Sequence, residues 1–409
     1  MITLRQRQLM LIGLFALSVV GIAAALYFVF FRGFFTEKAP ELTTEQTDSY
    51  AALPGSQEGA PSTTTSPTTT PELTEADEIA NGSITKTTEL TSSDVEGVTI
   101  SASGSDISFY NPSDGRFYTI NEDGEMVMLS DQQFPQAESI EWNNDSDKAV
   151  IEFPDGSNVV YDFQTEKQVT LPSHWEDFDF SETSDEIIAK SIGVDPNNRW
   201  LVVSNANGTN IQTLHELGEN ADKVDINWSP NDQVIAFADT ASNSTGSFDR
   251  KVILPVGMND ENLPGLTVEG MGFDSLWSPS GKQLLYSVSG DYSDYKPLLW
   301  IVDATATTMG ENRRSLGVNT WVDKCTFSST TTIYCAVPAA LPPNAGIQRS
   351  AYDSIPDSLY KIDLNSGRTS LVAVPDSSIP MQNLTISSDE SVLYFTNGTT
   401  GNLEMIRLK

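Results

Sequence analysis

Short apolar runs separated by polar turns repeat along most of the chain. From about residue 98 onward these runs are rich in Val, Ile, Tyr and Phe, and Asp-Gly, Asn-Gly and Ser-Gly pairs interrupt them. This pattern predicts β-strands joined by tight turns, and no stretch shows a helical period of useful length. Residues 106–130 illustrate it, because the turn signals Asp114-Gly115 and Asp123-Gly124 separate three predicted strands. We therefore expect an all-β region.

One unit of this pattern recurs along the chain. The segments NWSPNDQVIAFA and LWSPSGKQLLYS each contain an aromatic residue, a polar turn and an apolar cluster. Aligning the chain on the aromatic position gives six blade anchors: Trp142, Phe180, Trp228, Trp277, Phe327 and Ile386. Successive anchors are 38, 48, 49, 50 and 59 residues apart. Such spacing is typical of the four-stranded blades of a β-propeller.

The repeat predicts its own packing. An anchor ends the innermost strand of a blade, and the second strand is apolar because neighbouring blades cover both its faces. One blade alone cannot bury these faces, so the blades must form a closed ring. Six anchors and the 106–130 meander predict seven blades over residues 97–409, with six or eight as alternatives. Only two strands fit after Ile386, so we expect a strand from residues 98–102 to complete the last blade.

Two copies of the repeat allow a comparison with a known family. Trp228-Ser229-Pro230-Asn231-Asp232 and Trp277-Ser278-Pro279-Ser280-Gly281 resemble the Trp-Ser-Pro-Asp-Gly repeat of TolB-type, WD40-like β-propellers. The same repeat occurs in the propeller domains of prolyl-oligopeptidase-like peptidases. The resemblance implies a propeller that serves as a docking platform for proteins or ligands at the cell envelope.

The N-terminal region has a different composition. Residues 9–31 carry no charge and are long enough to cross a bilayer as a helix, so they predict a transmembrane signal anchor. Arg5 and Arg7 favour a cytoplasmic N-terminus, residues 1–8, with the remaining chain outside the cytoplasm. A cleaved signal peptide is the alternative. Residues 32–96, acidic and rich in Ser, Thr and Pro, are expected to form a disordered linker.

Charge narrows the range of partners. The chain has 56 acidic and 23 basic residues, a formal net charge of −33. Nucleic acid is excluded as an expected partner, because binding to its backbone requires clustered Lys and Arg. The expected partners are the membrane, through the N-terminal helix, and an envelope protein, peptide or glycan held by propeller loops.

Few residues suggest chemistry. Cys325 and Cys335 flank one predicted hairpin turn, which predicts a structural disulfide, with two free thiols as the alternative. The only histidines are His174 and His215. His174 has Glu176, Asp177 and Asp179 nearby, so a divalent metal site is the alternative there, but a solvated loop is expected, and neither histidine is expected to be catalytic. No nucleophile elbow and no phosphate-binding loop occurs. The sequence therefore predicts no catalytic, cofactor or metal residues, and no cofactor.

The function expected from these features is non-enzymatic binding or docking at the cell envelope. Tyr292 and Tyr295, in an acidic turn, are the candidate binding surface. The alternative is a propeller enzyme, a hydrolase or lyase that acts on envelope glycans, because paired carboxylates suffice for such chemistry. A purely structural spacer is the third hypothesis.

Overall fold

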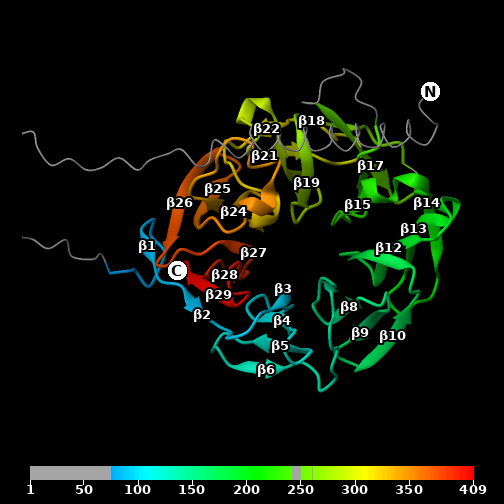
Figure 1. The fold of residues 1–409 in the computed structure, drawn as a ribbon, viewed down its shortest axis with the longest axis horizontal. Coiled ribbons are helices and arrows are strands. Elements are labelled where there is room, and N and C mark those ends of the chain that lie inside the picture. The colour runs from blue at the N-terminus through cyan, green and yellow to red at the C-terminus, as the bar shows by residue number, and fades with distance from the viewer. Residues whose placement is uncertain (1–74, 242–249, 260) are drawn as a thin grey trace, which may run out of the picture. The chain divides into compact units, whose positions relative to one another are not determined.

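The computed structural model describes residues 75–241, 250–259 and 261–409. Their strands form seven sheets, numbered here as blades 1 to 7 in chain order (Figure 1). The prediction of an all-β propeller with seven blades is confirmed. The predicted membrane helix, residues 9–31, and the N-terminal part of the predicted linker lie outside the described residues. Within the described ranges, no helix has both the length and the apolar character needed to span a bilayer.

The blades have the following strands. Blade 1 contains β3 (Glu96–Ile100), β4 (Ile107–Asn111), β5 (Arg116–Ile120) and β6 (Met126–Met128), and blade 2 contains β7 (Ser139–Trp142), β8 (Lys148–Glu152), β9 (Asn158–Asp162) and β10 (Lys167–Leu171). Blade 3 contains β11 (Trp175–Phe180), β12 (Glu186–Ile192), β13 (Arg199–Asn205) and β14 (Gln212–Glu216), and blade 4 contains β15 (Val224–Ile226), β16 (Val234–Ala238), β17 (Lys251–Gly257) and β18 (Leu266–Val268). Blade 5 contains β19 (Met271–Trp277), β20 (Gln283–Ser289), β21 (Pro297–Asp303) and β22 (Arg314–Ser315). Blade 6 contains β23 (Cys325–Ser329), β24 (Thr332–Pro338), β25 (Asp357–Asp363), β26 (Arg368–Pro375) and β1 (Ile84–Thr85), and blade 7 contains β27 (Met381–Ile386), β28 (Val392–Asn397), β29 (Leu403–Arg407) and β2 (Thr88–Glu89). Short 3-10 helices lie in the connections: η2 (Pro196–Asn198), η3 (Gly218–Lys223), η4 (Asp291–Ser293), η5 (Val322–Lys324) and η6 (Arg349–Ala351).

The blades follow one another around a common centre, with the first strand of each blade innermost (Figure 1). Inner strands of neighbouring blades contact each other, including β3 with β7, β7 with β11 and β27 with β3. The contact between β27 and β3 joins the last blade to the first. The ring is therefore closed.

Two short N-terminal strands complete the ring at its outer edge. β2 pairs antiparallel with β29, and β1 pairs parallel with β26 as a fifth strand. The prediction that residues 98–102 complete blade 7 is wrong, because residues 96–100 form β3, the inner strand of blade 1. The folded region also starts before the predicted boundary at residue 97. Outer strands bury few side chains, so their sequences lack the apolar pattern that marks the inner ones.

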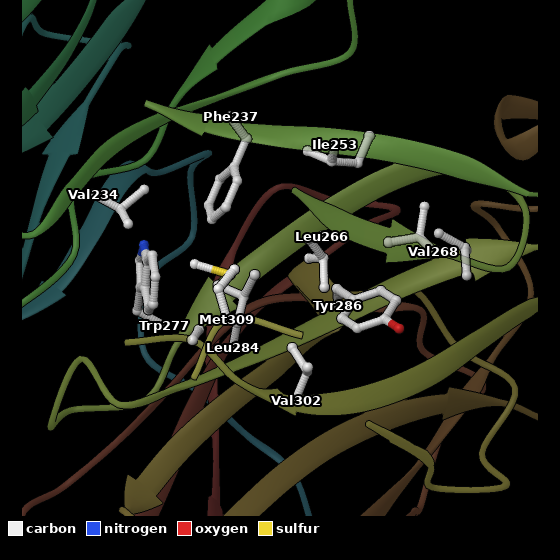
Figure 2. Packing of buried hydrophobic residues seen from close by; sticks show 12 residues of the cluster. Val234, Phe237, Ile253, Leu266, Val268, Trp277, Leu284, Tyr286, Val302 and Met309 are labelled. Atoms are coloured by element: carbon white, nitrogen blue, oxygen red, sulfur yellow. The ribbon is translucent and has the colours of Figure 1, made fainter. Parts of the chain in front are cut away.

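Apolar side chains fill the space between blades. Figure 2 shows the cluster between blades 4 and 5, where Phe237 and Ile253 face Trp277, Leu284 and Tyr286. Every residue of β16 is buried, because blades 3 and 5 cover its two faces. This double burial explains why the second strands are continuous apolar runs rather than alternating ones.

The anchors lie at or near the ends of inner strands. Trp142, Phe180, Trp277 and Ile386 are the last residues of β7, β11, β19 and β27. Trp228 follows β15 by two residues, whereas Phe327 lies within β23. The Trp142 indole donates a hydrogen bond of 2.6 Å to the backbone oxygen of Gly97, and the Trp277 indole donates one of 3.2 Å to Asn227. These anchors therefore face the preceding blade.

The turn after the anchor has a recurrent backbone. In blades 2, 4, 5 and 7, the fourth residue after the anchor has a left-handed backbone conformation. Its φ is 52° at Ser146, 55° at Asp232, 63° at Gly281 and 56° at Glu390. Gly104, with φ of 79°, occupies the same position after Ile100 and identifies the blade 1 anchor that the sequence did not reveal. Glycine is favoured at such a position, but the other residues show why the motif is recognisable in only some blades.

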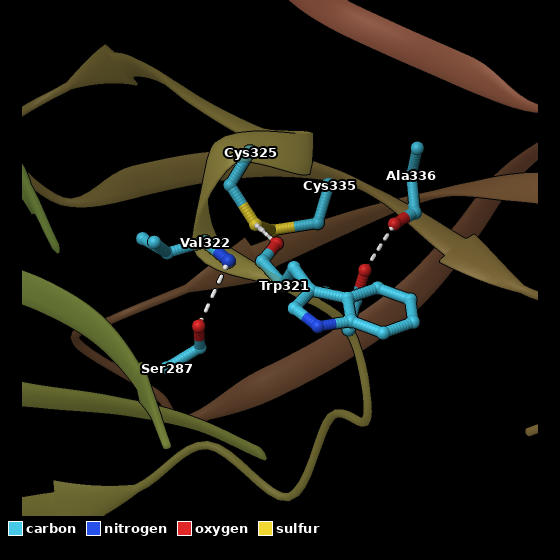
Figure 3. The surroundings of a disulfide bond; sticks show 7 residues. Ser287, Trp321, Val322, Cys325, Cys335 and Ala336 are labelled. Atoms are coloured by element: carbon cyan, nitrogen blue, oxygen red, sulfur yellow. Dashed lines mark hydrogen bonds between the residues drawn. A yellow bond between two sulfur atoms is a disulfide. The ribbon is translucent and has the colours of Figure 1, made fainter. Parts of the chain in front are cut away.

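The cysteines form the expected disulfide in the structure. Cys325 on β23 and Cys335 on β24 are directly paired across the two strands, and both are buried. Figure 3 shows the bond beside Trp321 and Val322, whose backbone N–H donates to the Ser287 hydroxyl of blade 5. The bond thus lies where blade 6 packs against blade 5.

Candidate active site between the inner strands

Acidic side chains gather on the inner strands of blades 2 to 5. Glu141 on β7 and Asp179 on β11 each directly precede an anchor. Asp177, Asp225 and Asp274 each lie three residues before an anchor. In a strand, neighbouring side chains point to opposite faces, so the residue before an anchor faces the following blade rather than the preceding one. Glu141 therefore faces blade 3, and Asp179 faces blade 4.

The orientation of Asp179 is fixed by backbone groups. One carboxylate oxygen accepts a hydrogen bond of 2.6 Å from the N–H of Trp228 in blade 4, and the other accepts one of 2.8 Å from the N–H of Phe180. Burial raises the pKa of Asp179 to about 7, and these two hydrogen bonds oppose the rise because they stabilise the charged form. Asp179 thus changes charge near neutral pH in a fixed position.

Glu141 has a different environment. Its carboxyl group forms no hydrogen bond or ion pair with any residue that the structure describes. Burial, together with the charges of Asp179 and Glu152, holds its pKa well above the ordinary range. The side chain nevertheless keeps partial access to solvent. Burial and neighbouring carboxylates thus favour the protonated form of this partly exposed carboxyl group.

Glu141 and Asp179 differ in the form that their surroundings favour. Two backbone donors stabilise charged Asp179, whereas no donor stabilises charged Glu141. When the pair holds one proton, it resides mainly on Glu141. General acid–base chemistry requires one group that keeps its proton and another that is ionised.

Other carboxylates of blades 2 to 5 also have raised pKa values. Burial, followed by the charge of Asp177, raises the pKa of Glu152 to about 7. Burial also raises the pKa values of Asp225 and Asp274, and neighbouring carboxylates, Asp323 foremost for Asp274, add to the effect. The inner strands of blades 2 to 5 therefore form an acidic wall of the central region.

Two cations balance part of this charge. Lys190, a buried residue of β12, forms an ion pair with Asp177. Arg349, from the long insertion of blade 6, forms ion pairs with Asp323 and Asp353. Its guanidinium group stacks over the Trp321 ring, 5.1 Å from the ring centre. Both cations thus already have carboxylate partners.

No obvious metal site accompanies the carboxylates. Within residues 75–241, 250–259 and 261–409, no group of three or more His, Cys, Asp and Glu side chains is arranged to hold a metal ion. His215 lies in blade 3, where a ring nitrogen is 2.8 Å from the backbone oxygen of Gly257. His174 is an exposed residue of the loop before β11.

The candidate surface residues lie elsewhere. Tyr292 and Tyr295 belong to the η4 loop of blade 5, not to the acidic wall. Tyr292 is 47% exposed, and its ring meets Trp300 edge-on with 5.8 Å between ring centres. The backbone oxygen of Tyr295 accepts a hydrogen bond from Gly346 in the blade 6 insertion. The structure therefore separates these residues from Glu141 and Asp179.

Sequence reasoning missed Glu141 and Asp179, although both lie inside the repeat. Each is the residue directly before an anchor, in the pairs Glu141-Trp142 and Asp179-Phe180. At this position a side chain lies between two inner strands, so a carboxylate there indicates a functional site more strongly than a carboxylate in an exposed turn does. That position was the available signal.

Comparisons with known proteins bear on the fold. No family model matches the chain, and no curated protein matches it, so membership of the TolB-type family remains a prediction. An oligogalacturonate lyase solved in complex with manganese is similar in structure, with a TM-score of 0.56, 14% identity and coverage of 79% of this chain and 93% of the lyase. The oligogalacturonate lyase of Vibrio parahaemolyticus has a TM-score of 0.50 and 10% identity over 79% and 93% of the two chains. At these identities the likeness concerns the fold alone.

These neighbours correct one expectation. Both are lyases, so the same propeller fold carries catalysis in them. The prediction that this chain is not an enzyme, which relied on the absence of familiar catalytic motifs, is therefore wrong. Motifs such as a nucleophile elbow belong to other folds, and a propeller can assemble its site from residues far apart in sequence.

Proposed function

We propose that the chain is a carboxylate-type enzyme that hydrolyses glycosidic bonds in glycans of the cell envelope. Glu141 is the general acid and Asp179 is its ionised partner. The observation that carries the proposal is the Glu141 carboxyl group, which lies between two inner strands without a hydrogen bond or ion pair among the described residues and has a strongly raised pKa.

Glu141 would act on the leaving group. It donates its proton to the glycosidic oxygen while the bond between that oxygen and the anomeric carbon breaks. Without this proton the leaving group would depart as an alkoxide, so acid assistance typically contributes 10²- to 10⁴-fold to the rate. A carboxyl group with an ordinary pKa would already be ionised at neutral pH and could not supply the proton.

Asp179 would act on the attacking water. Its carboxylate accepts a proton from the water molecule whose oxygen bonds to the anomeric carbon. The two backbone N–H donors hold the carboxylate in place and keep it partly charged near its pKa of about 7. Proton exchange with solvent then restores Glu141 to its acid form and Asp179 to its charged form.

The proposed location is outside the cytoplasm, with the N-terminal segment in the membrane. The apolar residues 9–31 and the preceding arginines support an anchor of this orientation. The disulfide between Cys325 and Cys335 supports an oxidising compartment. An enzyme held there would meet envelope glycans directly.

The test uses the full-length chain, purified in detergent, with an isolated envelope glycan fraction and with defined neutral, amino-sugar and uronic-acid oligosaccharides. Mass spectrometry should show products that have gained one water per cleaved bond, whereas a lyase would give unsaturated products without water. We expect Glu141→Gln to lower the rate at least about 100-fold. Glu138→Gln is the matched control, because Glu138 is exposed and lies three residues away, and it should retain the wild-type rate. Failure of the wild-type protein to cleave any of these glycans, or full activity of Glu141→Gln, would show that the proposal is wrong.

A further inference from the structure

A pocket lies where blades 5 and 6 meet, and nothing in the proposed reaction uses it. The cavity has a volume of about 390 Å³, which is within the usual range for small-ligand sites. Its walls come from five segments of the chain: the residue before β21, the connection after β22, the end of β24 with the insertion that follows, β25 and β26. Its lining includes Lys296, Val318, Asn319, Pro338, Leu341 and Tyr360.

The lining combines an apolar surface with a single charge. Val318, Val337, Pro338 and Leu341 supply aliphatic contacts. Of the described residues that line the pocket, only Lys296 is charged. A positive pocket is unusual in a chain whose net charge is −33. Its charge therefore selects for an anionic ligand that the acidic remainder of the surface would repel.

The polar groups of the pocket are available for a ligand. Among the described residues, the Lys296 ammonium and the Tyr360 hydroxyl form no ion pair or hydrogen bond. The Asn319 amide nitrogen donates to the backbone oxygen of Pro297, which fixes the side chain at the pocket wall. Two free donors beside an aliphatic wall match a carboxylate that is attached to an apolar group.

The pocket is also held in shape. Asp294 and Tyr295, the two residues before Lys296, both adopt left-handed backbone conformations, with φ of 52° and 54°. Backbone oxygens of these residues accept hydrogen bonds of 2.8 Å from Asn344 and 2.9 Å from Gly346. The insertion of blade 6 is thus tied to the loop that carries Lys296. Strained backbone held by surrounding contacts is common at ligand sites, because it positions a side chain before binding.

We propose that this pocket binds the C-terminal residues of a peptide with an aliphatic last side chain. The terminal carboxylate pairs with Lys296 and accepts a hydrogen bond from the Tyr360 hydroxyl. The last side chain packs on Val318, Pro338 and Leu341. The site is separate from Glu141 and Asp179, so it is independent of the proposed hydrolysis.

Isothermal titration calorimetry of the full-length chain with N-acetyl-Ala-Leu tests this site. We expect the free acid to bind and its C-terminal amide to bind at least about tenfold more weakly, because a hydrogen bond to a charged group is lost. Lys296→Met should weaken binding of the acid to a similar extent, and Tyr360→Phe should weaken it several-fold. Lys282→Met is the matched control and should bind normally, because Lys282 lies outside this pocket and also has no ion pair among the described residues.

Three results would overturn the proposal. They are equal binding of the acid and the amide, no effect of Lys296→Met, and no detectable binding of the acid. Hexanoate separates a peptide from a simple carboxylate, because it carries the charge and an aliphatic chain without peptide groups. Binding of hexanoate at least about tenfold weaker than the dipeptide supports the peptide assignment, and equal binding contradicts it.

Discussion

The pH dependence of stability gives a sharp test of the buried carboxylates, independent of any substrate. Asp179→Asn removes one titrating group from the space between blades 3 and 4. The asparagine keeps the size of the side chain and a carbonyl oxygen that accepts from the Trp228 N–H. Any change caused by altered packing is constant with pH, so the pH-dependent part of the difference reports on the Asp179 carboxyl group and on its effect on the pKa of Glu141.

The sign follows from proton binding in the two states. The pKa of Asp179 is raised from 3.8 to about 7 in the folded protein. Below about pH 4 the group is protonated in both states, and it adds no pH dependence. Between about pH 4 and pH 7 the folded state binds more protons than the unfolded state, so the free energy of unfolding of the wild type falls as pH rises. Above about pH 7 the Asp179 carboxyl group is ionised in both the folded and the unfolded state, so the free energy of unfolding falls no further.

The magnitude follows from the same difference. One pH unit of pKa difference corresponds to about 1.4 kcal/mol, so Asp179 destabilises the wild type by about 4 kcal/mol at high pH relative to low pH. Asp179→Asn cannot ionise and escapes this loss. The free energy of unfolding of the variant should therefore increase relative to that of the wild type by about 4 kcal/mol between about pH 4 and pH 8.

Urea unfolding of both proteins, followed by tryptophan fluorescence at several pH values in this range, measures the difference. Asp155→Asn is the control, because Asp155 is exposed and accepts hydrogen bonds only within its own turn. The account predicts a steady rise in the relative stability of Asp179→Asn across the range. A difference between Asp179→Asn and wild type that does not change with pH would refute the reasoning.

Two further variants test the packing of the ring. Gly281→Ala should lower the free energy of unfolding by about 1 kcal/mol, because alanine is strained in the left-handed backbone conformation. Overpacking should lower it by about 1–3 kcal/mol more, because the new Cβ would lie 2.8 Å from the backbone nitrogen of Asn231 in blade 4. Gly124 is also left-handed, but no atom lies within 4 Å of its new Cβ, so Gly124→Ala should lower the free energy of unfolding by only about 1 kcal/mol. Equal decreases for the two variants in urea unfolding would contradict the contact between blades. Lys324→Met should cost about 3–5 kcal/mol in the same assay, because it leaves the Asp357 carboxylate buried without its partner 2.7 Å away. A loss under about 1 kcal/mol would mean that this pair is solvated.

The propeller was predictable because each repeat contains the apolar residues that pack one blade against the next. Trp228 and Trp277 mark two blades directly, and the spacing of weaker anchors supplies the others. The first anchor, Ile100, was missed because it lacks an aromatic ring and a Pro. The closing strand Thr88–Glu89 was missed because hydrogen bonds to the edge of β29, rather than buried side chains, hold it in place.

The candidate site was harder to predict than the fold. In sequence, Glu141 and Asp179 resemble the polar positions of alternating strands. Their importance arises from the ring, which places the residue before an anchor against the next blade and limits its access to water. A raised pKa depends on this burial and on neighbouring carboxylates from other strands. The carboxylate residues can be read from the sequence, but the sequence does not show which of them lie close together in the folded protein.

The central claim is that Glu141 carries a proton at neutral pH. Infrared difference spectroscopy of the wild type and Glu141→Gln measures this most directly, because a protonated carboxyl group has a carbonyl band distinct from that of a carboxylate. The account predicts a carboxylic acid band, present only in the wild type, that persists at about pH 7 and disappears only at higher pH. Loss of this band by about pH 5, near the ordinary pKa of a glutamate, would contradict it.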